Sequence, residues 1–170
     1  MKTLNTYINE WKANTNSVSS INTQQYFVYK PNERGQIKIF EPYWPQFKDY
    51  KDKVYVNGEN VELNRYGYTI KKFKSRTCEV EIKDINDINN CKNMFFDCKH
   101  LISVSLFDTS KVNNMCRMFS ACYVLEDVPL FDISKVEDMN DMFYDCDSLN
   151  EQTKQIWSQV YNFKKNKKKQ

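Results

Sequence analysis

The cysteines and the one histidine are the residues whose chemistry could be catalytic or metal-binding. The chain of 170 residues holds His100 and six cysteines, at positions 78, 91, 98, 116, 122 and 146. Zinc sites combine several thiolates or imidazoles, usually with C-x-x-C pairs close in sequence. Cys98, Cys122 and Cys146 instead recur singly, 24 residues apart, with no histidine in the column. This spacing predicts a column of buried thiols, and zinc is the alternative.

His100 does not complete a persuasive catalytic pair. A Cys–His nucleophile needs both groups within hydrogen-bond reach and a third group that orients the base. Cys98 and His100 lie two residues apart in the motif CKHL, and Cys98 belongs to the regularly spaced column. Gly35, Gly58 and Gly67 are the only glycines, so no phosphate-binding glycine loop exists. We therefore expect no catalytic residue, no cofactor and no enzymatic activity.

A column of aspartates is the other regular set of chemically active side chains. Asp84, Asp108 and Asp132 recur every 24 residues, which suggests calcium binding. Each is better explained as a turn residue, because the carboxylate of an aspartate accepts hydrogen bonds from backbone N–H groups nearby. The sequence therefore predicts no metal site.

Composition and the first residues bear on the class of protein. Hydrophobic residues make up 41% of the chain and aromatic residues 15%, which is enough to build a core. The segment MKTLNTYINEWKAN has no apolar signal region, and no run of residues is long enough to span a bilayer. We expect a cytoplasmic protein with reduced thiols and no membrane contact.

The charge is concentrated at one end of the chain. The formal charge is +3, and without the five lysines of the terminal KKNKKK it would be −2. Such a tail is most often a solvated segment, so we predict disorder over residues 164–170. Contact of the tail with nucleic acid is a less favoured alternative, because no basic and aromatic patch joins it in the body.

The strongest pattern in the sequence is a repeat of 24 residues. The run FDTSKVNNMCRMFSACYVLEDVPL over 107–130 is followed directly by FDISKVEDMNDMFYDCDSLN. The residues before Phe107, back to about residue 83, form a more divergent third copy. A fixed period of this length is the signature of stacked repeats.

Each copy is predicted to contribute one helix and one strand. Val112, Met115, Met118 and Phe119 recur at helical spacing, and Val128 alternates with polar neighbours as in a strand. The expected fold class is an α/β repeat: a short right-handed leucine-rich-repeat-like solenoid of about three turns with a parallel sheet on its concave side. The predicted interior columns are Ile88, Met94, Phe95, Cys98, Leu101, Val112, Met115, Met118, Phe119, Cys122, Leu125, Val136, Met139, Met142, Phe143, Cys146 and Leu149.

The repeat resembles a known family. The run FDTSKVNNMCRMFSACYVLEDVPLFDIS is similar to the BspA-like leucine-rich repeat, whose pattern is close to F-D-T-S-x-V-x-x-M-x-x-M-F-x-x-C-x-x-L. The match covers about residues 83–150, and the first copy departs from it, since DINDINNC replaces the FDTS turn. The resemblance implies a solenoid and binding of proteins or surfaces. The short form without a leader resembles small members carried by bacteriophages.

The remaining segments are expected to close the ends of the repeat. Residues 1–19 are predicted to form a helix and a linker, and residues 20–82 a β-rich cap. In this cap, hairpins are expected around PNERG and around Asn57-Gly58. The repeats then span 83–150, with a C-terminal capping helix over 151–163 that starts at a capping box of Ser148 and Glu151.

Two surfaces are candidates for binding a partner. The first consists of small or acidic side chains on the predicted strands: Glu79, Glu81, Ser103, Ser105, Asp127 and Pro129. The second is the loop EPYWPQFKDY, where Tyr43, Trp44 and Phe47 either close the core or form an exposed hot spot. An acidic face disfavours phosphate backbones and suits a basic protein.

The expected function is a non-enzymatic protein–protein interaction module. A sharper hypothesis is a bacteriophage protein that binds and inhibits an antiviral complex in the host cytoplasm. The alternatives are a surface or virion recognition module, and a nucleic-acid-binding accessory that uses the lysine tail.

Overall fold

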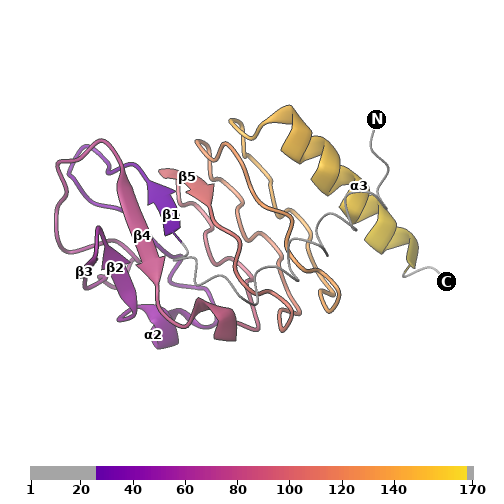
Figure 1. Cartoon of the computed structure of the whole chain (residues 1–170), viewed down its shortest axis with the longest axis horizontal. Helices are drawn as coiled ribbons and strands as arrows, with labels where there is room; N and C mark the ends of the chain where they lie inside the picture. Colours follow the sequence, from indigo (N-terminus) through magenta and orange to yellow (C-terminus); the bar gives the residue numbers. More distant parts are fainter. Residues whose placement is uncertain (1–25, 168–170) are drawn as a thin grey trace. The chain divides into compact units, whose positions relative to one another are not determined.

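The computed structural model describes residues 26–167 (Figure 1). Residues Gln25–Leu149 form one compact unit, and the helix α3 (Glu151–Lys167) belongs to a second. The helix predicted within residues 1–19 lies outside the described residues.

The first unit contains an open five-stranded antiparallel sheet with the strand order β3-β2-β4-β1-β5 (Figure 1). The strands are β1 (Tyr26–Tyr29), β2 (Val54–Val56), β3 (Glu59–Asn60), β4 (Cys78–Ile82) and β5 (Leu101–Val104). β1 lies between β4 and β5 and pairs antiparallel with both, so Phe27 is opposite Val80 on one side and Val104 on the other. A four-residue helix, α2 (Phe47–Tyr50), and a 3₁₀ turn, η1 (Ile85–Asp87), flank the sheet.

Alternation along the strands decides which face is buried. In β4, Cys78, Val80 and Ile82 are buried, while Glu79 is exposed and Glu81 is half-buried. The hairpin predicted at Asn57-Gly58 is confirmed as β2–β3, and both turn residues have positive φ, 50° and 82°. This backbone geometry is the one that suits Asn-Gly in a two-residue hairpin.

The hairpin predicted around PNERG is wrong. β1 pairs with β4 and β5, which lie far along the chain, and the N–H of Lys30 donates to the carbonyl of His100 at 2.8 Å. The segment QIKIF pairs instead with the residues around Tyr68, through an antiparallel bridge from Lys38. The local sequence correctly predicts a turn at Asn32, but tertiary packing determines which strands pair with β1.

The predicted α/β leucine-rich-repeat-like solenoid is also wrong. Residues 88–149 contain no α-helix, and β4 and β5 are not parallel neighbours, because β1 is inserted between them with antiparallel pairing. Two residues in each copy adopt a left-handed backbone, which an α-helix cannot contain. They are Asn93, Arg117 and Asp141 at one repeat position and Asp97, Ala121 and Asp145 at another, all with φ between 54° and 61°.

Successive turns replace the expected helix in each copy. Turns that reverse every few residues also place every third or fourth side chain on one side, which explains why the spacing resembled a helix. Asn90, Asn114 and Asp138 brace equivalent turns, each accepting the backbone N–H two residues ahead at 2.9–3.0 Å. In the predicted aspartate column, Asp108 and Asp132 accept the N–H groups of Ser110 and Ser134 in the same way, at 2.8 and 2.7 Å, which confirms their role as turn residues. Asp84 precedes η1 without such a side-chain bond.

Hydrogen bonds between equivalent backbone groups hold neighbouring copies together. The N–H of Cys91 donates to the carbonyl of Asn114 at 2.8 Å, and the N–H of Met115 donates to that of Asp138 at 2.7 Å. Aromatic rings repeat in the same way: the centroids of Phe95 and Phe119 are 5.5 Å apart, with nearly parallel planes. Phe119 and Phe143 follow at 5.7 Å.

Residues 38–46 cover the open edge of the first copy. The N–H of Glu41 donates to the carbonyl of Met94 at 3.0 Å, and the Trp44 indole N–H donates to the carbonyl of Asn90 at 2.6 Å. The ring of Phe40 lies 6.0 Å from that of Phe95 and so begins the aromatic row. This segment satisfies groups that would otherwise be unpaired at the edge.

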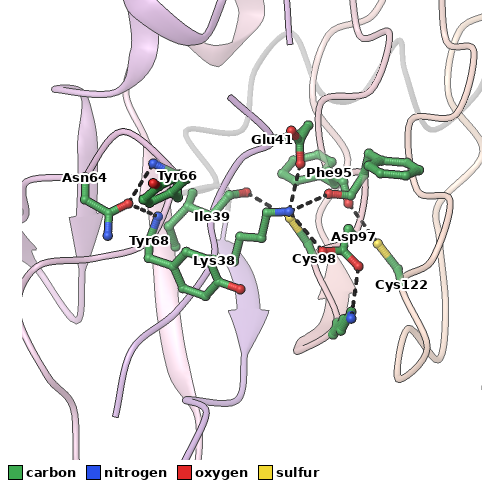
Figure 2. Close-up of polar contacts among 12 residues, drawn as sticks. Lys38, Ile39, Glu41, Asn64, Tyr66, Tyr68, Phe95, Asp97, Cys98 and Cys122 are labelled. Atoms are coloured by element: carbon green, nitrogen blue, oxygen red, sulfur yellow. Dashed lines mark hydrogen bonds and ion pairs between the residues drawn. The ribbon is translucent and has the colours of Figure 1, made fainter. Parts of the chain in front are cut away.

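A buried ion cluster joins the same two segments (Figure 2). Lys38 Nζ lies 2.8 Å from Glu41 Oε2 and 3.2 Å from Asp97 Oδ2, and it also donates to the carbonyl of Phe96. The side chains of Lys38 and Glu41 are only 8% and 10% exposed. Burial by itself lowers the pKa of Lys38, but the hydrogen bond to Glu41 reverses this and the pKa is raised overall.

The second unit contains the described helix α3, which extends the predicted helix to Lys167. Lys164, Lys165 and Lys167 are therefore helical, although the sequence predicted disorder there. Asn150 caps the helix, with its Oδ1 accepting the N–H of Thr153 at 2.8 Å, in place of the expected Ser148–Glu151 box.

Candidate binding surface

The exposed side of the sheet gathers most of the strand residues predicted to bind a partner. Residues directly opposite each other on paired strands point to the same face of the sheet. Glu79 is opposite Val28, and Val28 is opposite Ser103, which forms a parallel bridge with Asp127. A second row places Glu81 between Tyr55 and Tyr26. We call Tyr26, Val28, Tyr55, Glu79, Glu81, Ser103 and Asp127 the polar sheet face.

The carboxylate of Glu79 is the most available charge on this face. It makes no hydrogen bond or ion pair with the residues that the structure describes, and its side chain is exposed. Glu81 is half-buried and pairs with Lys83, whose pKa is raised by that hydrogen bond. The Lys83 ammonium also lies 5.3 Å from the centre of the Tyr55 ring. The face already binds one cation through a carboxylate and a tyrosine.

The other predicted strand residues lie at the edge of the polar sheet face. Ser105 follows β5, is half-buried and donates its hydroxyl to the carbonyl of Tyr26. Pro129 is half-buried beyond Asp127, which is exposed. The sequence expected Glu79 and Ser103 on directly adjacent strands, but β1 separates them and adds Tyr26 and Val28, two residues that the prediction missed.

The aromatic loop does not form one exposed patch. Trp44 is 2% exposed and Phe47 is also buried, whereas Tyr43 is 84% exposed. The Trp44 ring packs 4.8 Å from Phe40 and 5.4 Å from Tyr50, centre to centre. Trp44 and Phe47 therefore belong to the core, and of the three only Tyr43 presents its ring to solvent.

The six cysteines are free thiols, of which five are buried and Cys116 is half-buried. Burial raises the pKa of Cys91, Cys98 and Cys122, so these thiols stay protonated at neutral pH. Cys122 and Cys146 donate to the carbonyls of Phe95 and Phe119 at 3.1 and 3.0 Å. Within residues 26–167, no three His, Cys, Asp or Glu side chains are grouped so that they could hold a metal ion.

The predicted interior columns are found inside the first unit. Their members are buried from Ile88 to Leu149, with the exception of Phe143, which is half-buried in the last copy. The columns thus serve packing.

His100 lines a pocket that the sequence did not reveal. The pocket has a volume of about 530 Å³ and is walled by His100 and by two loops that begin at Asn32 and Asn64. The shared pattern of those loops, Asn followed three residues later by Gly, was the available signal.

Residues 64–169 match the family described as "Mycoplasma protein of unknown function, DUF285". The chain belongs to this family. The DUF285 match includes all three repeat copies, β4, β5 and α3 and excludes β1 to β3 and the segment that covers the repeat edge. No curated protein and no solved structure matches the chain. Among the helices of residues 26–167, none has the length and apolar character needed to cross a membrane.

Proposed function

We propose that this DUF285 protein is a non-enzymatic protein-binding module whose polar sheet face contacts a basic segment of another protein. The observation that supports the proposal is the carboxylate of Glu79, exposed and without a described partner, next to two tyrosine-bearing strands. Tyrosine is favoured at protein interfaces because one ring gives a large contact area and a polar tip. The similarity of the repeat to BspA-like proteins, which fall within the broad family, agrees with a binding role.

Charge favours a basic partner over an acidic one. Glu79, Glu81 and Asp127 give the polar sheet face three carboxylates, and Lys83 is the cation beside them. A lysine or arginine of the partner would find at Glu79 the kind of contact that Lys83 makes at Glu81 and Tyr55. A nucleic acid backbone would be repelled by the same carboxylates.

The test compares two charge reversals of equal size. Glu79→Lys changes the face, and Asp49→Lys places the same change on α2, where Asp49 is exposed and lies outside the sheet. Each tagged variant is used to capture proteins from a bacterial lysate, with and without nuclease treatment. We expect the wild-type chain and Asp49→Lys to capture the same discrete protein and Glu79→Lys to lose about tenfold or more of it, as for a charged interface pair.

Two results would contradict the proposal. Equal capture by all three variants would show that the polar sheet face is not the contact surface. Capture that disappears with nuclease treatment would point to nucleic acid as the partner. The sharper hypothesis of a bacteriophage inhibitor predicts that the captured protein is a component of a host antiviral complex.

A further inference from the structure

Two loops of the β-rich region share one sequence pattern and one hydrogen-bond pattern. Asn32 Oδ1 accepts the N–H groups of Arg34 and Gln36, both at 2.9 Å. Asn64 Oδ1 accepts those of Tyr66 and Tyr68 at 2.8 and 3.2 Å (Figure 2). We call these the Asn32 loop and the Asn64 loop. In both, a glycine with φ near 75° closes the turn onto the asparagine carbonyl.

The two loops are fixed against each other by the segments that follow them. The N–H of Ile39 donates to the carbonyl of Gly67 at 2.9 Å, and the N–H of Phe73 donates to that of Gly35 at 2.7 Å. Gly67 sits so close to the carbonyl of Phe40 that a Cβ would lie 1.9 Å from its oxygen. The loops therefore form a rigid frame whose shape does not depend on a ligand.

The pocket of about 530 Å³ lies within this frame, with His100 as a further wall. A backbone hydrogen bond holds His100 in place: its carbonyl accepts the N–H of Lys30 at 2.8 Å. All of the lining residues belong to the unit Gln25–Leu149, so the pocket is complete within one compact body. Its volume falls within the range of small-molecule sites and is large enough to hold a single sugar.

Most of the polar groups that face the pocket are hydrogen-bond donors. Both asparagine Oδ1 atoms are already occupied by backbone N–H groups, which leaves their amide N–H groups for a ligand. The Arg34 guanidinium and the His100 ring have no partner among the described residues. The hydroxyl of Tyr66 accepts from Arg65 at 2.6 Å, so its own hydrogen is free to donate. Such a set favours a ligand rich in oxygen atoms.

Charged groups and aromatic rings at the pocket narrow the chemical class of the ligand further. Arg34 lines the pocket, and Lys30 and Lys99 lie close enough to His100 to act on it electrostatically, with Lys99 also paired to Asp97 at 3.3 Å. Glu33 is the one carboxylate among the described lining residues, and it offers an acceptor for ligand hydroxyl groups. Tyr66 and Tyr68 provide ring faces, which pack well against a sugar ring.

We propose that this pocket binds an anionic sugar, a polyhydroxylated ring that carries a phosphate or a carboxylate. Arg34 and His100 contact the anionic group, Glu33 and the asparagine amides contact hydroxyl groups, and Tyr66 packs against the ring. The assignment is independent of the proposed protein contact, because the polar sheet face and the pocket share no residue.

Calorimetry with four probes tests the proposal: glucose 6-phosphate, glucuronic acid, glucose and inorganic phosphate. We expect at least one of the two anionic sugars to bind, and which one binds identifies the anionic group. Glucose and phosphate should each bind about tenfold more weakly, because each lacks one half of the recognised chemistry. Equal binding of glucose or of phosphate, or no binding of either anionic sugar, would overturn the proposal.

Matched variants test the named contacts. Arg34→Ala should weaken binding of the anionic sugar about tenfold, the effect of one charge-assisted contact, while Arg76→Ala, at an exposed arginine outside the pocket, should not. Tyr66 and Tyr144 are 56% and 63% exposed, so Tyr66→Ala and Tyr144→Ala form a second matched pair. If the two variants of either pair weaken binding equally, the ligand binds outside this pocket.

The single histidine of the chain gives an independent readout. Burial, Lys30 and Lys99 lower the pKa of His100, and Arg34 and Glu33 are the other charged groups that line the pocket with it. A bound anion adds negative charge beside the ring, which raises the pKa of His100 and makes binding tighter as pH falls through that pKa. An NMR titration of the imidazole with and without glucose 6-phosphate or glucuronic acid measures this shift. An unchanged pKa in the presence of a saturating ligand would exclude contact with His100.

Discussion

The repeat copies, residues 88–149, and the β-rich region, residues 26–82, are stabilised in different ways. In the repeat, one set of contacts is made again and again: Phe95, Phe119 and Phe143 stack in sequence, and equivalent backbone groups bond from copy to copy. In the β-rich region the Asn32 and Asn64 loops share one hydrogen-bond pattern, but its contacts with the repeat occur once each, as between Trp44 and Asn90. Repetition provides a regular interior, and the singular contacts cover its open edge.

The comparison teaches that the two kinds of contact should respond differently to mutation. A repeated contact has equivalents elsewhere in the chain, so the same substitution can be tried in two environments. A singular contact at the junction of the regions has no equivalent, and its loss affects both regions at once. Three substitutions separate these cases.

Phe95→Ala should give the largest loss of stability. The ring is fully buried and contacts Phe27, Phe40 and Phe119, so it joins both regions. Removing it should lower the free energy of unfolding by about 4 kcal/mol, as for other buried phenylalanines. Phe143→Ala, at the half-buried equivalent position in the last copy, should cost less than half as much in the same urea unfolding experiment. Equal losses would mean that Phe95 has no special role at the junction.

Lys38→Met should cost about 3 kcal/mol, because it leaves the buried Glu41 carboxylate without its cation. The double variant Lys38→Met/Glu41→Gln should regain a large part of this loss. The pKa of Lys38 is raised, so the stabilisation by the wild-type lysine is present at neutral pH and is lost only as alkaline pH passes the raised pKa. Unfolding curves at neutral and alkaline pH measure both effects. A double variant no more stable than the single one would show that charge burial is not the cause.

Gly67→Ala should cost about 2 kcal/mol, the smallest of the three effects, because of its positive φ and the close approach of the Phe40 carbonyl. Gly58→Ala is the control, since Gly58 has a similar φ of 82° but nothing within 4 Å of the added Cβ. The difference between the two free energies of unfolding isolates the close approach of the Asn64 loop to Phe40. If both variants lose the same stability, the frame of the pocket is looser than the geometry shows.

The repeat could be predicted from the sequence as a period, but its backbone could not. Identical residue types 24 apart revealed which positions are equivalent, and burial of methionine, cysteine and phenylalanine follows from hydrophobicity. The choice between helix and consecutive turns depends on the left-handed backbone at positions such as Arg117 and Ala121. Arginine and alanine carry no local signal for that backbone, and hydrogen bonds from the neighbouring copies are what stabilise it.

The candidate sites were predicted in part. The two-residue alternation correctly placed Glu79 and Glu81 outward on β4, because the pattern of one strand is local information. The insertion of β1 between β4 and β5 depends on pairs of residues far apart in the chain, such as Phe27 with Val80 and with Val104, which no local pattern encodes. The pocket needs two such loops and His100 together, so the repeated Asn-x-x-Gly pattern alone could not reveal it.

The bonded edge formed by residues 38–46 has a consequence for how such chains can evolve in length. Those residues occupy the N-terminal side of the first copy, where Glu41 and Trp44 donate hydrogen bonds to its carbonyls and Gln46 Oε1 accepts the N–H of Asn90. A duplicated unit inserted before Asn90 would separate these groups from their hydrogen-bond partners, whereas one inserted between existing copies would meet the same backbone groups as its neighbours. Gene duplication is therefore expected to add or remove units between existing copies and not at the N-terminal end of the repeat.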